Sequence, residues 1–360
     1  MAPAVVAATA LGALALGGGF ARAGAEEAAV SPIPADAKLI FSSARAGEES
    51  AIGFPAVELY AATLEGEVTR LTHSRGVHNH FTVSPDRTKI AANRYREDTD
   101  KDGRLFPIGD FKELWIIDVV NGTERKVAPE IDAGYGGIAW MPDSRHVVFG
   151  TPSDQGMDLV KLDTETGESE PLTRNLGKLL GSDDPRKFVS DVDVSPDGEW
   201  LAFLYNIPRT AENTGGVRPK TRVTVMRTDG SEARIVTDGG PLPPGKRGNW
   251  NNGDFDPDFS PDGKAVSFQR QTDVGMANPG LSTMDVMTVN IDGTGLTRIS
   301  PEGNDAAHGI SSWDVGGIVF TEWSDKRGNT AIVYDTQAKT FTRVPIEGQT
   351  SHVQWIPEAK

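Results

Sequence analysis

The chain has 360 residues, of which 36 are Lys or Arg and 51 are Asp or Glu, so its formal net charge is −15. This excess of acid argues against binding to nucleic acid or to an anionic membrane through net charge, and favours cations, basic partners or neutral ligands such as glycans. There is no cysteine, which excludes disulfides, zinc–thiolate sites, iron–sulfur clusters and a thiol nucleophile. The 40 glycines and 23 prolines favour a turn-rich, all-β chain over a helical bundle.

The first 25 residues differ in composition from the rest of the chain. Residues 4–20 form an uncharged run of Ala, Leu, Val and Gly, and Ala21-Arg22-Ala23 follows as a small-x-small pattern. This order is typical of a secretory signal peptide, with an uncleaved N-terminal anchor as the alternative. We therefore expect residues 1–25 to be a signal peptide and the mature chain to be periplasmic or secreted, with no membrane span.

A short phrase recurs through the remaining sequence. Its clearest copies are Ser84-Pro85-Asp86, Ser195-Pro196-Asp197 and Ser260-Pro261-Asp262, each after a short β-like segment. Variant copies are centred on Pro142, Trp313 and Pro357, so that six copies follow one another at intervals of about 50 residues.

Each copy carries the same series of predicted strands. A short strand enters the Ser-Pro-Asp-Gly turn, where Pro presets φ and Asp and Gly tolerate a tight reversal. An apolar strand such as 200–206 leaves the turn, and an alternating strand such as 222–226 and a fourth such as 232–236 follow. Four short strands per repeat are typical of a propeller blade, whereas no repeat has the 3.6-residue stripe of stacked helices. We predict an all-β, six-bladed β-propeller of four-stranded antiparallel blades over residues 36–358.

The two ends of this region complete each other. Strands are predicted at residues 38–42, 58–61 and 68–71 without a first strand, and at 352–356 without the other three. We expect these N- and C-terminal strands to form one blade that closes the ring. Removal of the last ten residues should then open the ring and expose two sheet edges.

The repeated phrase resembles the repeat of the TolB-like propeller family. Residues 260–268, SPDGKAVSF, and 195–203, SPDGEWLAF, are similar to it, and the resemblance extends over about residues 36–358. It implies the propeller fold and a place in the cell envelope. The same propeller occurs in sugar-acting lyases and attached to serine peptidases, but the chain has no Gly-x-Ser-x-Gly, so a peptidase is not expected.

An acidic loop lies between the second and third predicted strands of the first complete blade. It reads DTDKDGR over residues 98–104, with carboxylates at positions 1, 3 and 5 and glycine at position 6. Ca²⁺ prefers six to eight oxygen ligands, and this spacing wraps a loop around it. A solvated acidic turn is the alternative. The expected ligands of a structural Ca²⁺ are Asp98, Asp100, Asp102, the backbone carbonyl of Arg104, and Asp110.

The alignment of the six copies also aligns the residues that begin each innermost strand. Because these strands surround the axis, we expect their polar side chains to form a ring at one mouth of the central channel. Four of the six histidines fall there, and Asp193 and Asp258 follow in the same strands. The predicted ligand-binding mouth consists of His78, His80, Asp191, Asp254, Asp256, His308, His352 and Gln354.

Three roles are open for this ring: binding of a ligand or ion, hydrogen bonding between neighbouring blades, and catalysis. Imidazoles that face carboxylates can ligate a divalent transition metal or act as acid and base. Our main prediction is an exported, monomeric, non-catalytic binding or scaffold propeller that presents its mouth and loops to an envelope protein or a glycan. The alternative, which the resemblance to sugar lyases implies, is a metal-assisted polysaccharide or oligouronide lyase with His80, His308 and His352 as its catalytic residues.

Overall fold

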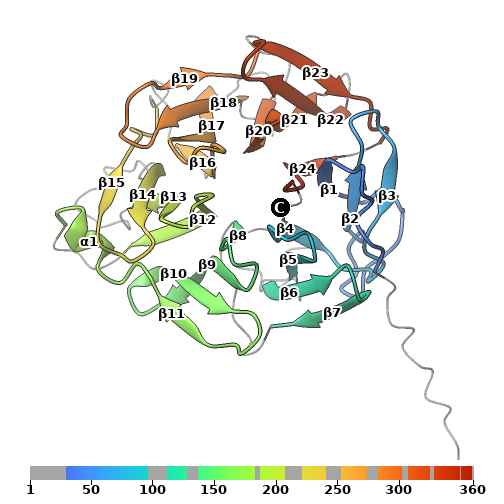
Figure 1. Cartoon of the computed structure of the whole chain (residues 1–360), viewed down its shortest axis with the longest axis horizontal. Helices are drawn as coiled ribbons and strands as arrows, with labels where there is room; N and C mark the ends of the chain where they lie inside the picture. The colour runs from blue at the N-terminus through green and yellow to red at the C-terminus, as the bar shows by residue number, and fades with distance from the viewer. Residues whose placement is uncertain are drawn as a thin grey trace, which may run out of the picture.

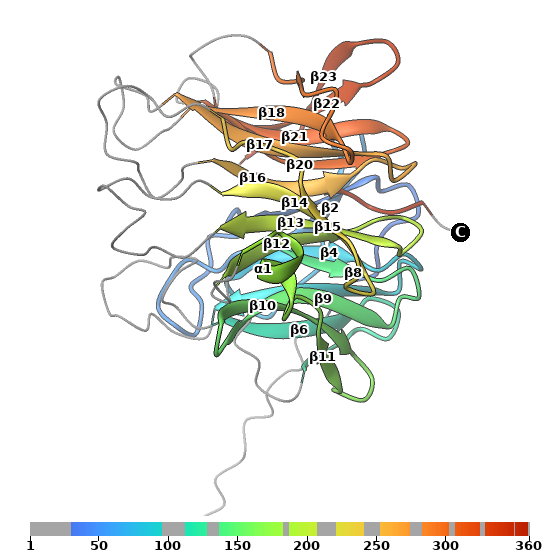
Figure 2. The ribbon, with the colours of Figure 1, turned by 90° about the vertical axis from the view of Figure 1, so that its left-hand side faces the viewer.

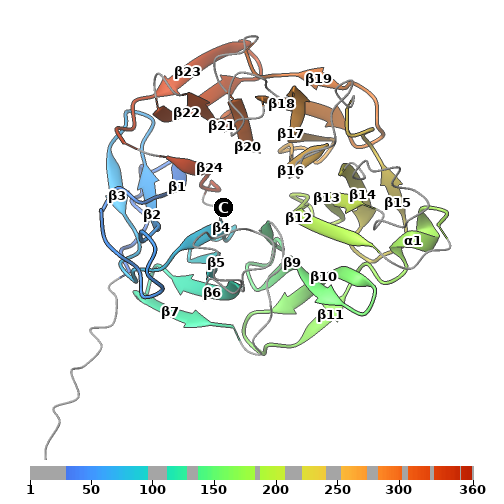
Figure 3. The same ribbon diagram turned by 180° about the vertical axis from the view of Figure 1, so that it is seen from behind.

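The computed structural model describes residues 30–95, 112–127, 137–182, 187–206, 221–240, 253–273, 283–301, 307–324, 328–348 and 350–358. In these ranges the strands form six four-stranded antiparallel sheets around one axis (Figures 1 and 3). The predicted all-β, six-bladed propeller is therefore confirmed. No helix within the described ranges is long and apolar enough to cross a membrane. The predicted signal peptide, residues 1–25, lies outside the described residues.

Blades two to six each consist of four consecutive strands, with the first strand innermost. Blade two contains β4 (His78–Val83), β5 (Lys89–Tyr95), β6 (Lys112–Asp118) and β7 (Thr123–Lys126). Blade three contains β8 (Ile138–Trp140), β9 (His146–Ser153), β10 (Gly156–Asp163) and β11 (Ser169–Pro171). Blade four contains β12 (Phe188–Val194), β13 (Trp200–Asn206), β14 (Arg222–Arg227) and β15 (Ala233–Ile235), and the short helix α1 (Leu176–Leu179) precedes it.

Blades five and six repeat this arrangement. Blade five contains β16 (Asp254–Phe259), β17 (Ala265–Asp273), β18 (Thr283–Asn290) and β19 (Thr297–Arg298). Blade six contains β20 (Ala307–Asp314), β21 (Gly317–Ser324), β22 (Gly328–Asp335) and β23 (Thr340–Val344). Figure 2 shows that the first and third hairpin turns of the blades lie on the side of the ring where the chain ends, and we call this side the turn face.

Blade one is built from both ends of the described chain. It contains β24 (Ser351–Trp355), β1 (Leu39–Ser43), β2 (Glu58–Ala62) and β3 (Val68–Arg70), in this order from the axis. β24 pairs antiparallel with β1, with Leu39 opposite Trp355 and Ile40 opposite Gln354. The predicted closure of the ring by the terminal strands is confirmed.

The core lies between neighbouring blades, and the strand period of two explains how one strand serves two seams. In β13, Leu201, Phe203 and Tyr205 belong to the apolar cluster shared with blade three. The intervening Ala202 and Leu204 belong to the cluster shared with blade five. These strands are therefore apolar on both faces, as sheets buried on both sides must be.

The recurring Ser-Pro-Asp phrase forms a turn with its own hydrogen bonds. The Ser195 hydroxyl donates to Asp197 Oδ1 over 2.6 Å and accepts from the backbone N–H of Trp200 over 2.9 Å. The same pair of bonds recurs at the turns that begin with Ser84 and Ser260. Because Ser195 is buried, its hydroxyl satisfies the backbone N–H of Trp200 within the turn, and in these three blades the phrase marks the end of the innermost strand.

Candidate functional site

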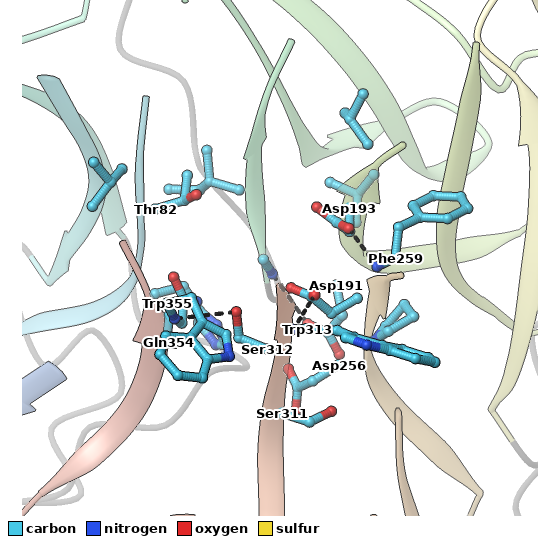
Figure 4. Close-up of a pocket in the computed structure, with 18 of the residues that line it drawn as sticks. Thr82, Asp191, Asp193, Asp256, Phe259, Ser311, Ser312, Trp313, Gln354 and Trp355 are labelled. Carbon is cyan, nitrogen blue, oxygen red and sulfur yellow. Dashed lines mark hydrogen bonds between the residues drawn. The ribbon is translucent and has the colours of Figure 1, made fainter. Parts of the chain in front are cut away.

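A cavity of about 200 Å³ lies on the axis and is lined by the innermost strands of all six blades (Figure 4). Toward one end it is lined by His80, Asp191, Asp256 and Gln354. Toward the turn face it is lined by Pro196, Trp313, Asp314 and Pro357, and we call this part the turn end of the cavity. The described lining residues include five aspartates and neither lysine nor arginine.

Bulges in the innermost strands set the positions of the polar side chains. The register of β12 on β13 shifts between Ser190 and Asp193, and that of β16 on β17 shifts between Phe255 and Asp258. Asp191 lies within the first bulge with a φ of +48°, which is uncommon for a residue other than glycine. A bulge bends the strand and redirects a side chain. In β12 it leaves both Asp191 and Asp193 against the cavity.

Polar side chains of the cavity join four pairs of neighbouring blades: three and four, four and five, five and six, and six and one. The backbone N–H of Phe259 donates to Asp193 Oδ2 over 2.8 Å, and that of Trp313 donates to Asp258 Oδ1 over 2.7 Å. The same kind of bond joins Gly137 N–H to Asp191 and Trp355 N–H to Ser312. The innermost strand is a free sheet edge, and its N–H groups otherwise lack a ladder partner. These aspartates therefore stabilise the ring, which is one of the three roles expected for the polar mouth.

The cavity disfavours the ionised form of these carboxyl groups. Burial raises the pKa of Asp193 and of Asp256 to about 6. Burial, together with the neighbouring Asp256, raises the pKa of Asp191, and burial with Asp193 raises that of Asp258. Desolvation and like-charge repulsion both oppose ionisation, so the cavity is an environment in which a positive charge would be stabilised.

Two histidines meet at the seam between blades one and two. The rings of His80 and His352 lie edge to face with their centres 5.1 Å apart. Burial lowers the pKa of His352 to about 4, and burial, His352 and Lys112 lower that of His80. Both imidazoles are therefore neutral at pH 7. His80 lines the cavity, while His352 contacts it through His80.

The structure does not place His78, Asp254 and His308 among the residues that line the cavity. Each instead faces a charged group within or beside its own blade. Both oxygens of the Asp254 carboxylate accept from Arg270, over 2.6 and 2.9 Å. His308 Nε2 lies 3.2 Å from Glu322, and His78 Nε2 lies 3.8 Å from Glu58. The expected ring of eight residues is thus reduced to His80, Asp191, Asp256 and Gln354 at the cavity, with His352 beside His80.

The reason for the displaced His308 is the length of one turn. β20 and β21 are joined by Val315 and Gly316 alone, whereas the Ser-Pro-Asp-Gly turns are longer. Trp313 pairs with Ile318 as Val194 pairs with Leu201 in blade four. Trp313 therefore corresponds to Val194 and not to Pro196, and our alignment of this copy was wrong by two residues.

The residues that line the turn end were not among those predicted from the sequence. Phe259, Trp313 and Trp355 line it, and each follows an aspartate, serine or glutamine of the innermost strand. The sequence contains a pattern that could have predicted them, because the residue after the inward-facing position is apolar or aromatic in most copies of the repeat.

The predicted calcium loop cannot be placed. Asp98, Asp100, Asp102, Arg104 and Asp110 all lie outside the described residues. In the part of the chain that the structure describes, no group of three or more His, Asp or Glu side chains is arranged to hold a metal ion.

Comparison with known proteins gives one match to a curated sequence. No family model matches the chain. The uncharacterized protein Atu1656 of Agrobacterium fabrum is 27% identical over 172 residues, which are 46% of this chain and 47% of that protein. The match thus spans about half the length of each protein.

Solved structures share the fold over most of the chain. TolB from Acinetobacter baumannii covers 91% of this chain and 68% of its own, with 16% identity and a TM-score of 0.57. A chain of the nidogen/laminin complex covers 89% of this chain and 99% of its own, with 9% identity and a TM-score of 0.55. The protein has the six-bladed propeller fold of TolB-like proteins, as its repeated phrase predicted. At these identities the likeness concerns the fold alone.

Proposed function

We propose that the protein is an exported, non-catalytic binding or scaffold propeller, periplasmic or secreted, that receives an envelope protein or a glycan at its axial cavity and neighbouring loops. The observation that supports this proposal most is the cavity lined by all six blades. Three of its aspartates, Asp191, Asp193 and Asp258, are already held by backbone donors of a neighbouring blade. A site whose polar groups are fixed before binding loses little conformational entropy when a partner arrives.

The alternative of a metal-assisted lyase needs His80, His308 and His352 at one site. His308 contacts Glu322 and is not among the residues that line the cavity, whereas His80 and His352 are neighbours. This separation favours the binding role over the catalytic one.

Blocking the cavity tests the binding role. Gln354 is half-buried and lines the cavity, so Gln354→Trp should fill the space with little effect on the core. Gln337→Trp, at the exposed turn before β23, is the matched control. We expect the unmodified chain and the control to retain envelope proteins or arrayed glycans, and Gln354→Trp to bind them at least about tenfold less tightly. Equal binding by all three, or turnover of acidic oligosaccharides that His80→Ala abolishes, would contradict the proposal.

We also propose that the acidic loop of residues 98–110 binds a structural Ca²⁺. Its spacing of three aspartates before a glycine supports this proposal. Elemental analysis should find calcium in the purified protein, and a chelator should lower its melting temperature. The double variant Asp100→Asn/Asp102→Asn should melt at the lower temperature with or without chelator. A protein that carries no calcium and melts unchanged in chelator would exclude the site.

A further inference from the structure

The turn end of the axial cavity combines apolar residues with the carboxyl group of Asp314. Its walls are formed by Pro196, Phe259, Trp313, Trp355 and Pro357. Trp313 is half-buried, and Figure 4 shows its indole among the side chains around the cavity. The indole N–H of Trp355 donates to the backbone carbonyl of Gly317 over 3.0 Å, which fixes the orientation of that ring. These walls suit a ligand with an apolar stem.

Carboxylates lie at the inner limit of these walls. Asp193 and Asp258 precede Val194 and Phe259 in β12 and β16, and both are half-buried. Each accepts a backbone N–H of the next blade, but a carboxylate offers about four lone-pair sites, so the structural bond leaves acceptor capacity. A donor that passes along the apolar walls would meet these two groups.

Charge decides which donor fits. The described residues that line the cavity include five aspartates and no lysine or arginine, and the exposed Asp197, Asp262 and Glu358 lie on the same face. A neutral glycan can donate hydroxyl hydrogens to carboxylates but brings no charge to offset them. The aliphatic stem of an arginine or lysine would pack along the walls, and its cation would interact with both the Trp313 ring and the carboxylates.

We propose that the turn end of the axial cavity binds a basic peptide segment of a partner protein, with an arginine or lysine side chain inserted between Trp313 and the carboxylates of Asp193 and Asp258. This inference rests on the proposed binding function and specifies the partner as a protein with a basic segment that approaches the turn face. Electrostatic complementarity of this kind sets specificity and association rate, and it weakens as salt screens the charges.

Ionisation of the carboxyl groups links this binding to pH. Burial raises the pKa of Asp193 to about 6, and the groups that face it are Asp258 and the backbone N–H of Phe259 and Val194. A bound cation favours the ionised carboxylate. The affinity should therefore increase as the pH rises from 5 to 8.

The experiment compares two fluorescein-labelled probe peptides by anisotropy at pH 8 and low salt, Gly-Trp-Arg-Gly-Arg-Gly and Gly-Trp-Glu-Gly-Glu-Gly. The test variant is Asp193→Asn/Asp258→Asn, in which the amide oxygens can still accept the bonds from Phe259 and Trp313. The control variant is Asp229→Asn/Asp292→Asn, at exposed turns between third and fourth strands. We expect the arginine peptide to bind at least about tenfold more tightly than the glutamate peptide, with this preference lost only in the test variant.

Equal binding of the two peptides, failure of the arginine peptide to bind, or an unchanged preference in the test variant would each overturn the inference. The Gln354→Trp experiment tests the proposed binding function independently of the basic peptide. If the arginine peptide fails while Gln354→Trp still abolishes capture of a glycan, the binding function stands and the basic partner is wrong. If both experiments fail, neither proposal survives.

Discussion

The aspartates of this propeller occupy two environments with opposite effects on their ionisation. In the turns, the hydroxyl of Ser195 and the backbone N–H of Glu199 donate to Asp197 and lower its pKa. In the cavity, burial raises the pKa of Asp193 to about 6, although Asp193 also accepts a backbone N–H. The difference arises because the turn carboxylate is exposed to water, whereas the cavity carboxylate of Asp193 is desolvated by the surrounding protein.

This contrast predicts opposite effects of two Asp→Asn substitutions. A raised pKa means that the folded state binds the proton more tightly than the unfolded chain, so ionised Asp193 destabilises the fold increasingly from about pH 4 to pH 7. Asp193→Asn should therefore raise the melting temperature more at pH 8 than at pH 4.5. The pKa of Asp197 is lowered, so its ionised carboxylate stabilises the fold at every pH above the pKa of the unfolded chain, about 4. Asp197→Asn should therefore lower the melting temperature at both pH 8 and pH 4.5, and its effect should shrink only below about pH 4. Thermal unfolding of both variants from about pH 3 to pH 8 measures the two signs, and equal signs at pH 8 would contradict the assignment.

Within a blade, the turn after the innermost strand is specified by local hydrogen bonds. Ser84, Ser195 and Ser260 are buried and make equivalent bonds in three blades. The turn of blade six lacks this serine and contains only Val315 and Gly316, and Gly317 has a φ of +108°. Blade six therefore shows that the sheet tolerates a shorter turn, at the cost of shifting its innermost strand by two residues relative to the repeat.

Loss of one serine hydroxyl should destabilise the element measurably. Ser195→Ala removes the acceptor of the Trp200 N–H and the donor to Asp197, and a buried polar group left without a partner costs about 1–3 kcal/mol. Urea denaturation should show this decrease in the free energy of unfolding. Ser231→Ala, at an exposed turn of the same blade, is the control and should change the free energy of unfolding by less than about 0.5 kcal/mol. A Ser195→Ala protein as stable as the control would mean that the turn holds without its hydroxyl.

The whole ring depends on strand β24. Its Val353 and Trp355 pack with Leu39 and Phe41 of the same blade and with Val344 of blade six. It pairs with β1 and is adjacent to β4 through the contact of His352 with His80. One five-residue strand therefore joins blades six, one and two.

Deletion of residues 351–360 should open the ring. The deletion removes the buried Val353, Trp355 and Ile356 and leaves the inner edge of β1 unpaired. We expect a large fall in melting temperature, loss of a single cooperative transition, and association through the exposed sheet edges. Thermal unfolding and size-exclusion chromatography measure these changes, and a chain that lacks only residues 359–360 serves as the control. A monodisperse truncated chain that melts like the control would show that β24 is dispensable.

The sequence by itself determined the number of blades, the order of strands and the closure of the ring. The physical reason is that the repeated phrase marks a turn whose bonds span only five residues, from Ser195 to Trp200, so its recurrence can be read without knowledge of the fold. The pairing of the terminal strands followed from the number of strands in each repeat. The N-terminal end has three strands of a blade without the innermost one, and the C-terminal end has an innermost strand without the other three.

Only the tertiary structure decided which side chains share the axis. A bulge places Asp191 against the cavity, and a shorter turn shifts His308 to a contact with Glu322. Strand faces alternate with every residue, so a shift of one position moves a side chain from the channel to a seam. A shift of two positions, as at His308, moves the side chain further along the strand and away from the cavity. The ionisation of Asp193 and Asp258 likewise depends on their burial and on their proximity across two blades, which no spacing within the repeat specifies.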